Sequence, residues 1–199
     1  MGVDKALVLV EGKTMISRMA ESLSKAGLEP IRISVSSVED VESYGSTIEV
    51  GASIEWVLDS KPFSGPIDAI AEAILDPQLD EIGTLQISPV DYPWLSSDLF
   101  RALEEGLGET DSLIMPHDGE RAHPLLALVR VEAMRLMLGT GDRRPLHRQF
   151  VEVPHSILME DPFLLRNVNS PKDLSEISPD DSMSIIWGYR ECSTCLTRS

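Results

Sequence analysis

Residues 6–35 read ALVLVEGKTMISRMAESLSKAGLEPIRISV, and this stretch decides the fold. The apolar run Ala6–Val10 has the length and composition of a strand. From Thr14 to Ala26 apolar residues recur every three to four positions, which predicts an amphipathic helix. Gly27 follows as a typical residue after a helix end, and Ile31–Val35 is the next predicted strand. The stretch therefore predicts a strand, a helix and a second strand.

The same alternation continues along the chain. Further strands are predicted at Ile54–Leu58, Thr84–Ile87, Ser112–Met115 and Leu125–Val129. Helical patterns lie between them, and two more helices are predicted to begin at Ser96 or Ser97 and at Ser170-Pro171. Strands that alternate with helices specify an α/β fold: a doubly wound, mostly parallel sheet, covered by helices on both faces, in three layers.

Length and charge limit the functions that the chain can have. Its 199 residues suit one domain, and its formal net charge of −16 argues against general affinity for nucleic acid or for an anionic membrane surface. No apolar stretch approaches the length that a bilayer requires, and the first residues lack the apolar core of a signal peptide. We therefore expect a cytoplasmic protein. Any phosphate-binding site must be confined to a small region, because the protein as a whole is strongly negative.

Chemistry in such a sheet is expected just beyond the carboxyl ends of its strands, where ligands bind. Polar residues follow the predicted strands at Asp59, at Asp91 and at the pair Asn167 and Asn169. A carboxylate such as Asp91 can hold Mg²⁺ together with phosphate oxygens and water, or it can cap the helix that follows. Lys5 can neutralise phosphate charge, or it can be an ordinary solvated lysine. Taken singly, these residues leave both interpretations open.

The two cysteines form a C-x-x-C pair, Cys192 and Cys195, close to the last residue of the sequence. Such a pair can be redox-active or can supply half of a zinc site, but the sequence has no third cysteine. An exposed segment without chemistry, a redox pair and a metal shared between subunits all remain open.

The order of the polar motifs is more informative than any one of them. The sequence contains, in turn, MGVDK at 1–5, SPVDYP at 88–93, HDGERAHP at 117–124, GDRRP at 141–145 and NVNSP at 167–171. This ordered set resembles the molybdenum cofactor guanylyltransferases, which have a Rossmann-like fold of the nucleotide-diphospho-sugar transferase type. The resemblance covers residues 1–174, which we interpret as one nucleotidyltransferase-like domain. Residues 175–199 form a C-terminal tail to which the resemblance assigns no role.

The resemblance implies a reaction and a set of site residues. Members of the family transfer GMP from GTP to molybdenum-bound molybdopterin, with Mg²⁺, and release pyrophosphate. By position, Lys5 and Asp91 would be the catalytic residues, and Asp91 would hold the Mg²⁺. The residues that would bind the nucleotide are Gly2, Lys5, Asp59, Gly65 and Asp91. Those that would lie toward the molybdopterin acceptor are Asn167, Asn169, His123 and Arg143.

Rival functions share part of this pattern. The same fold could transfer CMP to the pterin or GMP to a cobalamin precursor, or the chain could bind molybdopterin without catalysis. In a panel of nucleotides, GTP against CTP is the first comparison, and it separates cytidylyl transfer from guanylyl transfer. Association into a homo-oligomer is also open.

The resemblance further implies a segment that would precede Met1. In the family, a first, central strand and a glycine-rich phosphate loop stand before the residues that match MGVDK. We therefore expect that the natural protein begins upstream, at another start codon. A form that begins at Met1 is expected to bind GTP poorly and to have a sheet with two open edges at the place of the central strand.

Overall fold

The computed structural model describes residues 4–49, 51–59, 66–168, 173 and 185–188. Within these residues, seven strands form one sheet. They are β3 (Ile31–Val35), β4 (Ile54–Leu58), β5 (Thr84–Pro89), β6 (Leu113–His117), β7 (Leu128–Arg130), β8 (His155–Met159) and β9 (Ile185–Gly188). The helix predicted at Ser170-Pro171 and the two cysteines lie outside the described residues.

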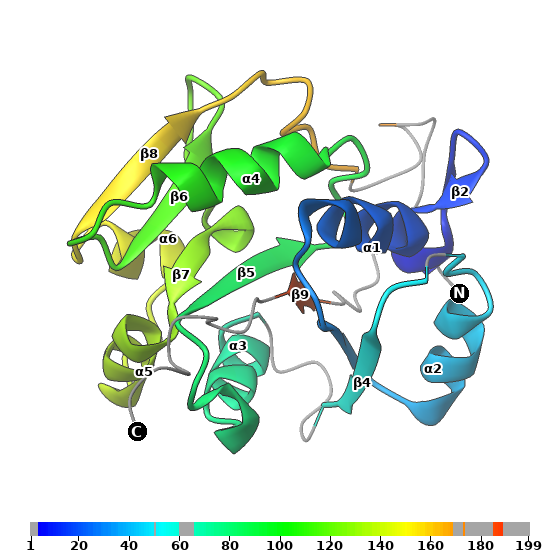
Figure 1. Cartoon of the computed structure of the whole chain (residues 1–199), viewed down its shortest axis with the longest axis horizontal. Helices are drawn as coiled ribbons and strands as arrows, with labels where there is room; N and C mark the ends of the chain where they lie inside the picture. Colours follow the sequence, from blue (N-terminus) through cyan, green and yellow to red (C-terminus); the bar gives the residue numbers. More distant parts are fainter. Residues whose placement is uncertain (1–3, 50, 60–65, 169–172, 174–184, 189–199) are drawn as a thin grey trace, which may run out of the picture.

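The sheet is mixed, with most of its strands running in one direction (Figure 1). Its strand order is β4-β3-β9-β5-β7-β6-β8. The pairs β3–β4 and β6–β8 are parallel, whereas β7 and β9 are antiparallel to both of their neighbours. Consequently β3, β4, β5, β6 and β8 all point the same way, and their carboxyl ends share one edge of the sheet. The predicted α/β class is confirmed.

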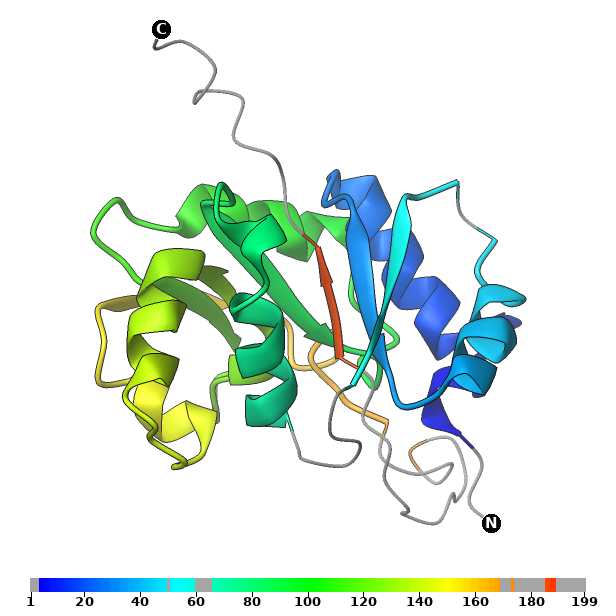
Figure 2. The same ribbon diagram turned by 90° about the horizontal axis from the view of Figure 1, so that it is seen from below.

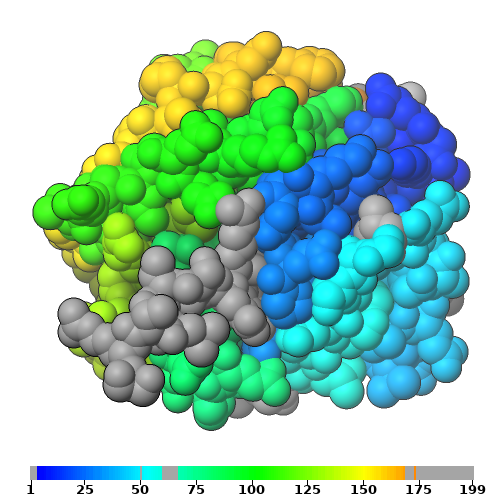
Figure 3. All heavy atoms as spheres, in the orientation of Figure 1, coloured from blue at the N-terminus to red at the C-terminus, as the bar shows by residue number. Residues whose placement is uncertain are grey.

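Helices cover both faces of the sheet (Figure 2). One face carries α1 (Met15–Ala26), α2 (Val38–Gly45) and α4 (Ser97–Gly106), and the other carries α3 (Pro66–Ile74), α5 (Val131–Gly139) and α6 (Leu146–Phe150). Three short 3₁₀ helices are η1 (Lys5–Leu7), η2 (Pro77–Leu79) and η3 (Pro124–Leu126). Figure 3 shows α1 and α4 side by side across the first face. No described helix is long and apolar enough to cross a bilayer.

Helix α1 follows the sequence closely. The Thr14 side chain accepts a hydrogen bond from the Ser17 N–H (3.3 Å), which satisfies one free donor of the first turn. Gly27 ends the helix at φ 80°, a conformation that glycine adopts without steric cost. Ile16 and Leu23 are fully buried against the sheet. The helix predicted from apolar spacing is therefore confirmed.

The strand predicted at Ala6–Val10 is wrong. Its first residues form η1, because the Asp4 side chain accepts from the Ala6 N–H (3.0 Å) and caps a tight turn. The following residues form a small hairpin outside the main sheet, with β1 (Leu9–Val10) antiparallel to β2 (Lys13–Thr14). The two residues of its turn, Glu11 and Gly12, both have positive φ (52° and 83°), as a tight hairpin turn requires.

The strand predicted at Leu125–Val129 is shorter than expected and begins later. Pro124 opens η3, where its missing N–H is not needed, so β7 starts only at Leu128.

The C-terminal segment Ile185–Gly188 lies in the middle of the sheet rather than outside it. As β9 it pairs with β3 on one side and with β5 on the other, antiparallel to both. Its backbone satisfies the N–H and C=O groups that β3 and β5 present to each other. The expectation of two open edges at this position is therefore corrected: within the described residues, β9 occupies the place.

Candidate functional site

Asp59 and Asp91 lie at the same height on the carboxyl edge of the sheet. Strands β3 and β5 both pair with Ile186 of β9, which fixes their mutual register, and β4 is in parallel register with β3. Counting along the strands places Asp59, the first residue after β4, level with Asp91, the second residue after β5. Three strand spacings separate β4 from β5, so the two backbones are roughly 14 Å apart. An extended, polar ligand can reach both.

Lys5, Asp91 and Asn167 come together at this edge. Asp91 is 8% exposed, and burial raises the pKa of its carboxyl group to about 6. The Lys5 ammonium and a hydrogen bond from the Asn167 side chain act in the opposite direction and lower that pKa. Both groups must lie close to the carboxylate to have this effect. Residues from η1, from the loop after β5 and from the segment after β8 thus form one site.

Backbone contacts hold the three residues in place. The Val168 N–H donates to the Asp91 carbonyl oxygen (2.7 Å), which fixes the neighbouring Asn167 beside the end of β5. Lys5 begins η1, whose Ala6 is 1% exposed. The Arg18 Nε of α1 donates to the Pro93 carbonyl (2.8 Å) and ties the Asp91 loop to the helix.

The Asp91 carboxylate has an unused oxygen. Oδ1 is buried and has no hydrogen-bond partner among the described residues. An unpaired buried acceptor is costly, and a divalent cation would satisfy it. Magnesium prefers one or two carboxylates together with phosphate oxygens and water. The described residues contain no group of three or more His, Cys, Asp and Glu side chains suited to a metal, so the other ligands would come from substrate and solvent. The residues at this site are therefore suited to bind Mg²⁺.

Asp59 has a partner that sequence reasoning missed. The Ser34 hydroxyl, 7% exposed at the end of β3, donates to Asp59 Oδ1. Burial raises the pKa of the Asp59 carboxyl group, the Ser34 hydrogen bond lowers it, and the negative charge of Glu72 raises it further. The two residues are 25 positions apart, so only the parallel pairing of β3 with β4 brings them together.

His123 is enclosed by polar partners of its own chain. It is 3% exposed, its Nε2 lies 2.8 Å from Asp118 Oδ2, and its Nδ1 lies 3.2 Å from the Tyr92 hydroxyl oxygen. Sequence reasoning placed His123 toward the acceptor and did not single out Tyr92 or Asp118. Both lie within the quoted motifs SPVDYP and HDGERAHP, so the motifs located these residues but not their contacts.

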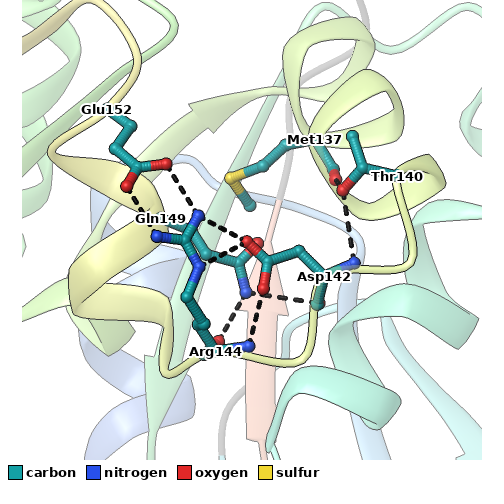
Figure 4. A network of polar contacts seen from close by, with 6 residues as sticks. All are labelled: Met137, Thr140, Asp142, Arg144, Gln149 and Glu152. Atoms are coloured by element: carbon teal, nitrogen blue, oxygen red, sulfur yellow. Dashed lines mark hydrogen bonds and ion pairs between the residues drawn. The ribbon is translucent and has the colours of Figure 1, made fainter.

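Both arginines of GDRRP form ion pairs with acidic residues of the same chain. Arg143 forms an ion pair with Asp68 in the first turn of α3. The Arg144 guanidinium lies between Asp142 and Glu152, as Figure 4 shows, with contacts of 2.6 to 2.8 Å. Arg144 also lines a surface cavity of about 650 Å³, and Lys5, Asp91 and Asn167 do not line it. The structure thus gives Arg143 an acidic partner and does not bring it into the group formed by Lys5, Asp91 and Asn167.

Three residues predicted for the site lie outside the described residues: Gly2, Gly65 and Asn169.

Known proteins match this chain along most of its length. The model of the MobA-like NTP transferase domain matches residues 1–154. A probable molybdenum cofactor guanylyltransferase of Rhodopirellula baltica is 27% identical over 180 residues, which cover 87% of this chain and 83% of that protein. The molybdenum cofactor guanylyltransferase of Photobacterium profundum is 29% identical over 183 residues, covering 88% of this chain and 87% of the relative.

Solved structures show the same fold. Molybdopterin-guanine dinucleotide biosynthesis protein A of Archaeoglobus fulgidus superimposes with a TM-score of 0.57 at 19% identity, over 85% of this chain and 86% of that one. The 4-diphosphocytidyl-2C-methyl-D-erythritol synthase of Anaerococcus prevotii gives 0.65 at 11% identity, over 83% and 85%. At these identities the likeness concerns the fold alone.

Proposed function

The chain belongs to the MobA-like NTP transferase family, and from this premise we propose that it transfers GMP from GTP to molybdopterin-bound molybdenum, with release of pyrophosphate. The names of the curated relatives support the choice of reaction. The observation that carries the proposal is the meeting of Lys5, Asp91 and Asn167 at the carboxyl edge of the sheet. A cation, an anion with an unused oxygen and a neutral amide form a small site suited to phosphate groups.

The reaction needs charge neutralisation more than proton transfer. An oxygen of the acceptor's terminal phosphate forms a bond to the α-phosphorus of GTP, and the bond from that phosphorus to pyrophosphate breaks. The attacking phosphate is already ionised at neutral pH, so no general base is required. Both reactants are anions, so the protein must hold them together against repulsion and in line.

Lys5 and Asp91 would have different roles in this reaction. Lys5 would bind the triphosphate and offset its charge, and Asp91 would hold Mg²⁺. When bound there, Mg²⁺ supplies positive charge against the phosphate oxygens. Partial burial of the site strengthens these charge interactions relative to those in water.

The remaining site residues are assigned by position. Asp59, held by Ser34, would contact the nucleoside, and Gly2 and Gly65 would lie along the nucleotide. Asn167 and Asn169 would lie on the acceptor side. Arg143 and His123 are weaker candidates for that side. Asn167 is the residue in this set whose position beside Asp91 supports its assignment.

Pyrophosphate release tests the proposal. The chain is incubated with molybdenum-loaded molybdopterin, Mg²⁺ and either GTP or CTP, at millimolar nucleotide because we expect low affinity for GTP. Pyrophosphate should appear with GTP, should require the acceptor, and should be much slower with CTP. Asp91→Asn should abolish the reaction. The matched control Asp98→Asn, on an exposed helix position, should leave the rate unchanged.

Two results would overturn the proposal. Pyrophosphate release that is faster with CTP than with GTP would assign a different nucleotide. Binding of molybdopterin without pyrophosphate release from either nucleotide would indicate a binding protein instead of a transferase.

A further inference from the structure

Three side chains beside the Asp91 loop form a continuous hydrogen-bonded chain. Tyr92 directly follows Asp91, and its hydroxyl contacts His123 Nδ1, while His123 Nε2 contacts Asp118 Oδ2. The rings of Tyr92 and His123 also pack edge to face, with centroids 5.7 Å apart and an interplanar angle of 85°. A histidine that is 3% exposed and has both nitrogens occupied cannot readily contact a substrate directly. Its influence on the site must pass through its neighbours.

The direction of each hydrogen bond can be assigned. Asp118 Oδ1 accepts from the backbone N–H groups of Glu120 and Arg121, each at 2.8 Å. The hydrogen bond from the Arg121 N–H is the main cause that holds the pKa of the Asp118 carboxyl group well below its usual range. An ionised carboxylate only accepts, so His123 donates through Nε2–H. Burial lowers the pKa of His123. The neutral ring then accepts at Nδ1 from the Tyr92 O–H.

In this series of hydrogen bonds, the end formed by Asp118 and His123 is fixed to the backbone. The His123 N–H donates to the Pro116 carbonyl (2.9 Å), and the His123 carbonyl accepts from the Leu126 N–H (2.9 Å). Together with the two N–H bonds to Asp118, these contacts attach the imidazole to β6 and η3. Tyr92 is therefore bound to a well-supported part of the fold, one residue away from Asp91.

We propose that Asp118, His123 and Tyr92 are positioning residues that hold the Asp91 carboxylate in the orientation needed to bind a divalent cation. The proposal rests on the proposed nucleotidyl transfer, in which Asp91 is the cation ligand. Asp91 Oδ1 has no partner of its own among the described residues that would fix its direction. Apart from the Asn167 hydrogen bond, the orientation of this carboxylate depends on the Asp91 loop, and small displacements of a ligand weaken a metal site strongly.

The hydrogen-bond directions are tested without turnover. Long-range proton–nitrogen NMR of the histidine rings should show His123 protonated on Nε2 and not on Nδ1. Tyr92→Phe should change the Nδ1 shift of His123 and leave that of His155, on β8, unchanged. Protonation of His123 on Nδ1, or no change in Tyr92→Phe, would overturn the chain of hydrogen bonds.

The positioning role is tested with Mn²⁺ as the probe, in the presence of GTP, by electron paramagnetic resonance. Tyr92→Phe and His123→Phe should weaken Mn²⁺ binding about 10- to 100-fold. His123→Gln should restore much of the affinity, because an amide can donate to Asp118 and accept from Tyr92. The matched control His155→Phe should bind Mn²⁺ as the wild type does.

The outcomes separate this role from a purely structural one. A structural residue would lower the unfolding temperature but leave Mn²⁺ affinity unchanged well below it. Equal Mn²⁺ affinity in the wild type and Tyr92→Phe, or no Mn²⁺ binding by the wild type, would overturn the proposal. If the wild type binds Mn²⁺ yet releases no pyrophosphate, the proposed function has failed, and the Mn²⁺ affinities of the variants still decide the positioning role.

Discussion

Asp91 is a residue whose position favours function over stability. The fold buries its carboxyl group and raises its pKa to about 6, while leaving Oδ1 without a hydrogen bond among the described residues. Ionising such a group in the folded state costs free energy that the unfolded chain does not pay. The same unused oxygen is what suits the carboxylate to a cation.

Asp91→Asn should therefore stabilise the metal-free protein at neutral pH. The unfolded carboxyl ionises near pH 4 and the folded one near pH 6, so wild-type stability falls as pH rises through this window. An amide does not ionise, so the variant escapes a loss on the order of 2 to 3 kcal/mol. Urea unfolding in the presence of a chelator, at pH 4 and at pH 7.5, measures the difference.

The advantage of Asp91→Asn should grow between pH 4 and pH 6 and stay constant above it. Asp98→Asn should show no such growth, because Asp98 is exposed on α4. An advantage of Asp91→Asn that is the same at both pH values would mean that Asp91 ionises normally.

Lys5→Ala tests the other charge of the site. Removing the ammonium should raise the KM for GTP about tenfold or more, since a charge-assisted hydrogen bond contributes about 1.5 to 3 kcal/mol. The effect on the KM for GTP should exceed the effect on the unfolding temperature, because Lys5 is only partly buried. Steady-state kinetics and thermal unfolding are compared with Lys25→Ala, an exposed lysine paired with Glu21. An unchanged KM for GTP would remove Lys5 from the nucleotide site.

At the scale of single elements, helix ends are set by backbone conformation. Gly27 closes α1 at φ 80°, whereas Gly139, the last residue of α5, has no positive φ and no atom within 4 Å of an added Cβ. Gly27→Ala should lower stability by about 1 kcal/mol, and the unfolding temperature by about 2 to 4 °C. Gly139→Ala should leave both unchanged or slightly higher. Thermal unfolding of the pair is the measurement, and equal midpoints would show that α1 tolerates a side chain at its end.

Elements with local signals could be predicted from the sequence. Helix α1 carries an apolar period, a capping threonine and a terminal glycine, and all three act within a few residues of each other. The strand expected at Ala6–Val10 failed because a capping contact from Asp4 and a tight turn outweighed apolar composition. Long-range contacts left no such signal.

The candidate site also has a part that could be predicted from the sequence and a part that could not. Ordered motifs predicted Lys5, Asp91 and Asn167, and the structure brings these three together. The contacts of Ser34 with Asp59 and of Tyr92 with His123 join residues 25 and 31 positions apart. Periodicity and spacing carry no record of which distant strands become neighbours, so these pairs could not be predicted.

At the scale of the whole molecule, β9 joins two parts of the sheet. Without it, β4–β3 on one side and β5–β7–β6–β8 on the other have no shared strand pairing among the described residues. The core that α1 forms with β3 and with the Asp91 loop would remain, but two sheet edges would open.

Removing residues 185–199 should therefore destabilise the protein and promote association through the opened edges. Size-exclusion chromatography with light scattering should show oligomers, and urea unfolding should begin at lower concentration. The matched control removes only residues 189–199 and keeps β9, so it should behave as the full chain does. If both truncated forms remain in the same state and unfold alike, β9 does not hold the sheet together.

The place of β9 also determines when the molecule can be completed. Every other strand of the described sheet precedes residues 185–188 in the chain, so those strands leave the ribosome first. The nascent polypeptide must then carry two unjoined half-sheets until residues 185–188 have also been synthesised. Assembly of the edge that carries the candidate site, which spans both halves, therefore depends on the strand that is synthesised after all the others.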